Sequence, residues 1–399
     1  MKLDKPRRPS VLVTSEIELE QLIRDLASDP GSIAIDAERA SGFRYSQRAY
    51  LIQIALRDQT IYMVDPVALS EVEDWEMRLK EVLNPRTWLL HAATQDLPCL
   101  SDLGFAPQQI IDTELAARLA GFERVGLGSL ALELLGIELA KEHSASDWSQ
   151  RPLTEEMLHY GALDVDVLHE LWDAVETVLK DANKLDWALQ EFEHLLSFKP
   201  KPQLEEPWRN LPGISKVKDL KKLRIAASLW HARDEIAQAE DIAPGRLIPD
   251  RSIMAAVDQV PKSKSDLAQN KAFQGRASRS KLGIWWEAIA RSEDFEIAAE
   301  APRTGGIPNH RSWEKRFPQA HIRLSVVRPL VQELATELNL PVENLITPDY
   351  LRRVMFEPAL DIKAQLVSLG VRSWQVDLVL PVIEAGLNQA RPLLDALEA

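Results

Sequence analysis

Paired carboxylates near the start of this 399-residue chain have the spacing that a metal site needs. Asp36 and Glu38 follow the apolar run 32–35, which is typical of a β-strand. Residues i and i+2 of a strand face the same side, so the two carboxylates converge at one strand end. Like charges placed so closely repel each other unless protons or a cation relieve them. Taken alone, the pair also fits a solvated strand end.

Two later positions add carboxylates of the same kind. Asp96 stands in the first turn of an expected helix after the apolar run 88–91. An acid there is also explained by the helix dipole alone. Tyr160 and Asp164 are four residues apart, so they share one face of a helix that apolar residues continue. A buried Asp needs a partner, because an unpaired buried charge is costly. Either a metal ion or hydrogen bonds between helices would supply one.

The elements that must position these residues alternate short apolar runs with helical patterns. Strands followed by helices imply an α/β domain with a mixed sheet. Asp58 and Gln59 supply a turn between two of the strands, which predicts a hairpin. We expect strands at 32–36, 50–56, 61–64 and 88–91, and helices at 69–83, 96–103, 113–120, 127–135 and 154–180.

Strand signals stop at a proline-rich stretch, and the rest of the chain is predicted to be helical. Three prolines lie within 200–207, where they remove helix donors and fix φ. A second break at 302–308 separates two helical regions. The predicted organisation is a catalytic domain at 1–197, a linker at 198–209, a helical domain at 210–292 and a C-terminal helical domain at 303–399.

The ordered set of motifs resembles the tyrosine-bearing (DEDDy) branch of the DEDD 3′–5′ exonucleases, and within it the ribonuclease D family. The run D-W-x-x-R-P-L-T at 147–154, followed by Y-x-x-x-D-V at 160–165, carries the resemblance, which covers about residues 10–190. It implies a ribonuclease H-like fold and a metal-dependent exoribonuclease. Such an enzyme trims RNA 3′ ends, for example of tRNA precursors, and releases 5′-mononucleotides.

The resemblance also implies a role for each acidic residue. Asp36, Glu38, Asp96 and Asp164 match the carboxylates that hold two divalent ions, Mg²⁺ or Mn²⁺. These hard ions prefer oxygen ligands, and two of them can serve both oxygens of an in-line displacement. Asp36 would bridge the ions, Glu38 and Asp164 would complete one, and Asp96 would assist the other. Tyr160 matches the tyrosine that positions or activates the attacking water.

One departure from the family concerns the terminal nucleotide. Arg39 stands where the family often has an aromatic residue that contacts the terminal base, and Phe43 and Tyr45 offer rings for stacking instead. Four candidates also have a structural reading: a solvated loop for Arg44, a core histidine for His91, part of the sheet for Gln53 and a surface lysine for Lys141. Cys99 is expected to be a small buried hydrophobe. The substrate-binding candidates are Arg39, Phe43, Arg44, Gln53, His91 and Lys141.

The charge distribution singles out the central helical region. The chain carries a net charge of −14, yet residues 209–291 hold 16 Lys and Arg against 9 Asp and Glu. The run 223–253 resembles an HRDC domain, and residues 303–399 are expected to be HRDC-like. Basic side chains there would contact phosphates without sequence specificity. Helix solubility is the alternative reading of the same charges.

Several classes of protein are excluded or disfavoured by composition. A single cysteine excludes a disulfide framework, and no run reaches the ~18 apolar residues of a membrane span. We expect a cytoplasmic monomer that acts on RNA 3′ ends, or on DNA. Two alternatives remain open at this point: a DNA exonuclease of repair, and a non-catalytic nucleic-acid-binding protein on the same fold. Metal binding that depends on Asp36 would disfavour the second.

Overall fold

A six-stranded mixed sheet forms the centre of the first domain. The computed structural model describes the chain except for residues 141–145, 201–204, 299–305 and 399. The strand order is β2-β5-β4-β3-β6-β7, with β4 antiparallel to both neighbours and the other pairs parallel. The expected α/β class with a mixed sheet is therefore confirmed. The strands are β2 (Ser10–Val13), β3 (Ile33–Arg39), β4 (Ala49–Leu56), β5 (Ile61–Val64), β6 (Thr87–Leu90) and β7 (Gln109–Asp112).

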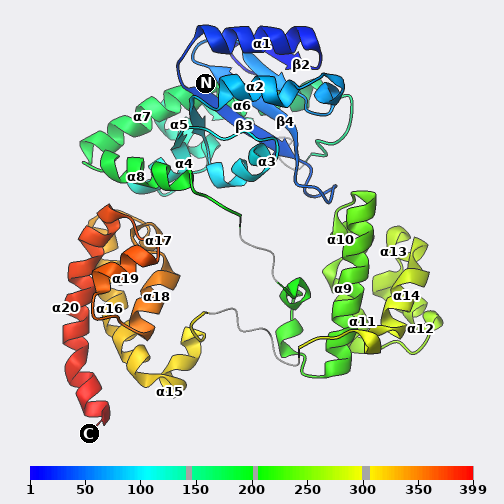
Figure 1. The fold of residues 1–399 in the computed structure, drawn as a ribbon, viewed down its shortest axis with the longest axis vertical. Helices are drawn as coiled ribbons and strands as arrows, with labels where there is room; N and C mark the ends of the chain where they lie inside the picture. Colours follow the sequence, from blue (N-terminus) through cyan, green and yellow to red (C-terminus); the bar gives the residue numbers. More distant parts are fainter. Residues whose placement is uncertain (141–145, 201–204, 299–305, 399) are drawn as a thin grey trace.

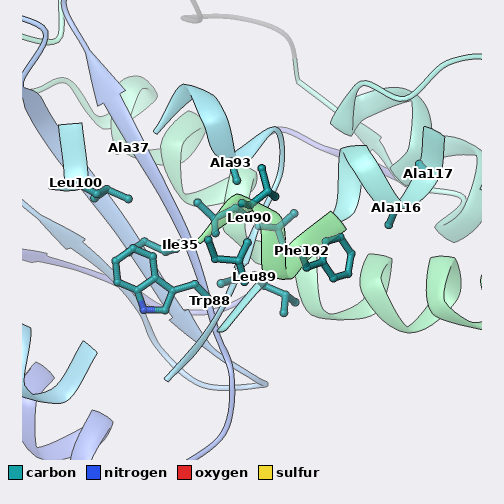
Figure 2. Packing of buried hydrophobic residues seen from close by; sticks show 14 of the residues in the cluster. Ile35, Ala37, Trp88, Leu89, Leu90, Ala93, Leu100, Ala116, Ala117 and Phe192 are labelled. Atoms are coloured by element: carbon teal, nitrogen blue, oxygen red, sulfur yellow. The ribbon is translucent and has the colours of Figure 1, made fainter. Parts of the chain in front are cut away.

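Helices cover the sheet and seal its apolar core. All eight residues of β4 are buried, as expected of a continuous apolar strand that is covered on both faces. Figure 2 shows Trp88, Leu89 and Leu90 of β6 packed near Ile35 and Phe192. The helices of this domain are α1 (Glu16–Ser28), α2 (Trp75–Leu83), α3 (Leu97–Asp102), α4 (Thr113–Ala120), α5 (Leu127–Leu135), α6 (Glu155–Asp166), α7 (Leu168–Asp181) and α8 (Leu185–Leu195).

Two predicted helices are each divided in the structure. The stretch 69–83 contains a short 3-10 helix and then α2, separated by residues that include Asp74 with φ 54°. The stretch 154–180 breaks at Val167 between α6 and α7. Arg7 and Arg8 reach the Asp166 carboxylate at this break, at 3.1 and 2.7 Å. These contacts join residues far apart in the chain, so local periodicity does not reveal them. Strands β2 and β7 and helices α1 and α8 were not predicted.

The second unit is all-helical and has its own core. Its longest helix, α9 (Leu220–Glu240), packs against α11 (Asp250–Gln259) and α14 (Leu282–Ala290). Trp208, Phe273 and Trp285 are buried in this core, so the packed unit begins inside the stretch predicted as a linker. The shorter helices are α10 (Pro244–Leu247), α12 (Lys264–Gln269) and α13 (Arg276–Ser280).

The third unit is also helical and packs on the first domain through α8. Trp187 of α8 stacks on Trp374 with ring centroids 4.8 Å apart, and Glu191 forms an ion pair with Arg372. The Lys184 ammonium donates to backbone carbonyls of both units. The two units therefore share one apolar cluster. The helices here are α15 (Trp313–Arg316), α16 (Pro318–Glu337), α17 (Val342–Leu345), α18 (Pro348–Phe356), α19 (Ile362–Ser368) and α20 (Ser373–Glu398).

Figure 1 shows the first domain at the top, the third unit below α8 on the left and the second unit at the lower right. The loop between β3 and β4 descends toward α9 and α10. Among the described residues, no helix is both long and apolar enough to cross a membrane.

Candidate active site

Three acidic side chains from two elements converge above the sheet. Asp36 and Glu38 project from β3, and Asp164 projects from α6, which packs on β3, β4 and β5. One carboxylate oxygen from each residue lies within 4.8 Å of the others. This spacing lets a single cation contact all three carboxylates. Asp96 lies beside them and shares a hydrogen bond with Asp36.

A strained turn places Asp96 at the start of α3. Ala92 has φ 61°, a left-handed conformation that residues other than glycine seldom adopt. The Asp112 carboxylate accepts hydrogen bonds from the N–H groups of Ala92 and Ala93, at 3.1 and 2.8 Å. Asp112 also caps α4 through Glu114 N–H. This side chain thus fixes the turn that presents Asp96, and its charge helps to raise the pKa of Asp96.

The segment 146–153, which carries part of the diagnostic motif, is held by an arginine. Arg151 donates to both carboxylate oxygens of Asp65, at 2.6 and 2.7 Å, and to the Tyr50 and Trp148 carbonyls. The motif arginine therefore ties the approach to α6 onto β4 and β5. The helix that follows this segment carries Tyr160 and Asp164.

The acidic residues line an open cavity of about 420 Å³. Arg39, Phe43 and His91, three of the predicted substrate contacts, line it as well. Sequence reasoning did not identify Ser41, Gly42, Ala92, Gln95 and Ser146, which also line the cavity. Ser41 and Gly42 lie in the same loop as Phe43. Their closeness to Phe43 in the sequence was the one feature that could have identified them as lining residues.

Burial dominates the electrostatics of this cluster. It raises the pKa of Asp36 to about 6 and, helped by the Asp36 charge, the pKa of Asp96 to about 9. Burial and the charges of Asp36 and Asp164 raise the pKa of Glu38 to about 10. Burial also raises the pKa of Asp164 well above its ordinary value. A bound cation would offset the repulsion between these carboxylates when they are ionised. Carboxylate oxygens are hard ligands, which suit a divalent ion such as Mg²⁺. The residues present therefore fit a divalent metal site.

Tyr160 and His91 are both held neutral at the edge of this cluster. Burial and the charges of Asp164 and Glu38 raise the pKa of the Tyr160 phenol, which therefore keeps its proton at neutral pH. The Tyr160 ring lies 6.3 Å from the Trp148 ring. Burial lowers the pKa of His91 to about 4, and its Nδ1 lies 2.9 Å from Thr113 Oγ1.

The other predicted substrate contacts lie away from the lining. Arg44 donates to Ser149 Oγ at 2.8 Å, and Gln53 is the partner of Asp36 on the neighbouring strand β4. Gln53 is fully buried, and its amide has no hydrogen-bond partner among the described residues. Lys141 lies outside the described residues. Cys99 is buried, as expected of a small hydrophobe.

The second unit holds the loop that carries Phe43. The Arg246 guanidinium lies 3.9 Å from the centre of the Phe43 ring, and Arg246 Nε donates to the Gly42 carbonyl at 2.7 Å. The Ala243 N–H donates to the Phe43 carbonyl at 3.0 Å. Tyr45, expected as a stacking ring, instead donates from its hydroxyl to Asp234 of α9. One wall of the cavity is thus supported from the helical unit.

Comparison with known proteins identifies each part of the chain. Residues 10–180 match a family described as 3′-5′ exonuclease, residues 222–294 match the HRDC domain, and residues 306–387 match a 3′ to 5′ exonuclease C-terminal domain. The fold, together with the acidic cavity that it builds, therefore defines a 3′–5′ exonuclease. The exonuclease domain of this family is metal-dependent.

Relatives over most of the chain give the particular family. Ribonuclease D of Zymomonas mobilis is 30% identical over 292 residues, covering 71% of this chain and 72% of the relative. Ribonuclease D of Gluconacetobacter diazotrophicus is 27% identical over 365 residues, covering 88% of each chain. The chain belongs to the ribonuclease D family, which confirms the resemblance seen in its motifs.

Solved structures agree with this fold. The crystal structure of a protein from Bifidobacterium adolescentis is 33% identical, with TM-score 0.88, and covers 97% of this chain and 99% of its own. Escherichia coli RNase D, described as an exoribonuclease involved in structured RNA processing, has 21% identity and TM-score 0.69. That match covers 95% of this chain and 99% of the Escherichia coli chain, and it supports the arrangement of all three units.

Proposed function

We propose that this protein is a 3′–5′ exoribonuclease that trims structured RNA ends, such as those of tRNA precursors, and releases 5′-mononucleotides. The observation that carries the proposal is the convergence of four carboxylates and Tyr160 in one open cavity. Ribonuclease D relatives supply the choice of RNA over DNA. The protein would act as a cytoplasmic monomer.

The carboxylates divide into two groups around Asp36. Asp36, Glu38 and Asp164 would hold one divalent ion, and Asp36 with Asp96 would hold a second, which we take to be Mg²⁺ or Mn²⁺. Bound ions would activate a water and stabilise the charge of the leaving oxygen. Asp36 belongs to both groups and would therefore be the ligand that the two ions share.

Tyr160 keeps its phenolic proton and therefore offers a hydrogen-bond donor beside Asp164 and Glu38. We propose that it orients the attacking water rather than removing a proton from it. The basic residues of the HRDC unit would add contacts to RNA outside the cavity. Lys216 and Lys218 at the start of that unit are exposed, and Lys221 is also engaged by Glu293 at 3.4 Å.

Cleavage of 5′-labelled single-stranded RNA and of the matching DNA, with Mg²⁺ or Mn²⁺, tests the proposal. A ladder that shortens from the 3′ end of RNA is expected, and Asp36→Ala should abolish it while leaving RNA binding in place. Arg24→Ala on α1 controls for an unrelated surface change, because the Arg24 side chain is 59% exposed and does not line the cavity.

Each other result has a definite meaning. A ladder on DNA alone would assign the protein to DNA exonucleases. Full turnover in Asp36→Ala would refute the metal site. Intact binding without cleavage of either polymer would point to a non-catalytic nucleic-acid-binding protein.

A further inference from the structure

A β-bulge lies beside the arginine that follows the acidic pair of β3. Glu38 pairs with Leu51, but Arg39 pairs with Ala49, so Tyr50 is an extra residue on β4. Neighbouring residues of a regular strand point to opposite faces. Residues 36–39 all line the cavity, and the Arg39 guanidinium lies beside Asp96 within it. The bulge interrupts the regular strand pairing next to Arg39, and bulges are common beside active sites.

Arg39 faces the carboxylates without a hydrogen bond to any of them. Its Nη2 lies 3.9 Å from Asp96 Oδ1, which is an ionic contact beyond hydrogen-bond distance. The Arg39 side chain is 28% exposed, whereas that of Asp96 is 6% exposed. Among the hydrogen bonds of the described residues, none uses an Arg39 side-chain donor.

Arg86 and Arg151, by contrast, use their side-chain donors in hydrogen bonds within the protein. Arg86 donates to the Val82, Gly31 and Leu26 carbonyls, and Arg151 holds the Asp65 carboxylate. Arg39 is the only lysine or arginine among the described residues that line the cavity. The cavity wall therefore contains one guanidinium with free donors, next to the site where a phosphodiester must lie for cleavage.

We propose that Arg39 binds the phosphate at the 3′-terminal linkage of the substrate, exchanging its contact with Asp96 for that phosphate. The proposal rests on the exonuclease function proposed above and assigns a substrate ligand within it. A guanidinium presents five donors in a planar fork that matches phosphate oxygens. It also supplies a positive charge where the anionic substrate meets four carboxyl groups. An aromatic residue at this position would offer neither property.

Product binding tests this role without any cleavage. A 5′-mononucleotide keeps the phosphate of the cleaved linkage, whereas adenosine lacks it. We would titrate 5′-AMP and adenosine into the full chain with Mn²⁺ by calorimetry. Arg39→Ala should weaken 5′-AMP binding by about ten- to a hundredfold, the range for a hydrogen bond to a charged group. Adenosine binding should not change.

Two further variants separate phosphate recognition from a general charge effect. Arg39→Lys keeps the charge but loses the fork, so it should restore part of the 5′-AMP affinity. Arg24→Ala removes the same charge from the exposed face of α1 and should leave both ligands unaffected.

The Mn²⁺ isotherm without nucleotide shows whether the metal site is intact in each variant. Arg39→Ala should keep Mn²⁺ binding at least as tight as in the wild type, since a competing cation beside Asp96 is gone. Unchanged 5′-AMP affinity in Arg39→Ala would overturn the proposal, and so would loss of Mn²⁺ binding together with 5′-AMP binding. If the wild type bound neither Mn²⁺ nor 5′-AMP, the proposed function itself would fail.

Discussion

Protons on Asp36, Asp96 and Glu38 control what the cavity can bind. Their pKa values of about 6, 9 and 10 lie above the ordinary values of 3.8 and 4.5. A carboxyl group must lose its proton to coordinate a metal ion. At neutral pH, the ion-free cavity therefore holds protons that a divalent ion must displace.

Mn²⁺ binding should release protons, and its affinity should rise between about pH 6 and pH 9, where the cited pKa values of Asp36 and Asp96 lie. The sign follows from the direction of the shifts. A raised pKa means that the ion-free protein keeps protons that the ion-bound protein lacks, so higher pH favours the bound form. Calorimetry in buffers of different ionisation heat counts the protons released.

Asp96→Asn provides the matched comparison. An asparagine carries no titratable proton, so this variant should release fewer protons at pH 7.5 than the wild type does. Equal release by both proteins would place the displaced protons on other groups and contradict the raised pKa of Asp96.

The same shifts bear on the stability of the ion-free protein. Because the folded-state pKa values are raised, the favourable contribution of these protonated groups is complete below about pH 4 and is lost as the pH rises through 6 to 10. The unfolding temperature of chelator-treated protein should therefore fall more steeply from pH 6 to pH 9 than that of Mn²⁺-loaded protein. Parallel curves would be the contrary result.

The approach to α6 depends on the Arg151–Asp65 ion pair. Asp65 has a side chain that is only 3% exposed, and Arg151 is 24% exposed. Arg151→Ala would leave a buried carboxylate without its partner. We expect a loss of about 3–5 kcal/mol in the free energy of unfolding, the range for breaking a buried pair. Urea denaturation followed by tryptophan fluorescence measures it.

Arg57→Ala is the control for this prediction. Arg57 makes an ion pair of similar geometry with Asp173, at 2.7 Å, but the two side chains are 46% and 55% exposed. An exposed pair contributes about 0–1 kcal/mol. Similar losses in the two variants would mean that Arg151 does not hold the segment as described.

Local patterns predicted the core elements well, because their causes lie within a few residues. Helices 113–120 and 127–135 and strand 61–64 have the predicted bounds. Asp112 and Gly121 flank the first helix, and Gly126 and Gly136 flank the second. The contacts of Arg7 and Arg8 at the break and the bulge opposite Arg39 join segments far apart in the chain, so no local pattern contains them. The acidic residues were identified from motif order, whereas the rest of the lining required the fold.

At the scale of the whole molecule, the HRDC unit supports one wall of the cavity through a loop of the first domain. Asp241 at the end of α9 accepts from the Ser46 N–H at 2.9 Å, and Arg246 holds Gly42 and Phe43. These contacts act on a loop of the first domain. The HRDC unit is therefore expected to influence cleavage of substrates too short to reach its own basic surface.

Deletion of residues 209–399 does not isolate this effect. It would remove the basic residues and the loop contacts together, and it would expose Trp187 of α8, which stacks on Trp374. Single substitutions on the HRDC unit separate the two contributions, because the loop contacts and the exposed lysines lie at different positions.

Arg246→Ala should lower kcat/KM about three- to tenfold on a trinucleotide and by a similar factor on long RNA. The variant loses a cation–π contact and a hydrogen bond worth about 1–2.5 kcal/mol together, and only part of this reaches catalysis because the Ala243 and Asp241 contacts still hold the loop. Lys218→Ala, on an exposed residue of the same unit, should instead raise KM for long RNA alone, with a weaker salt dependence. Steady-state assays on both substrates distinguish them. If Arg246→Ala changed only the long substrate, the HRDC unit would act as an RNA-binding surface and not as a support for the cavity wall.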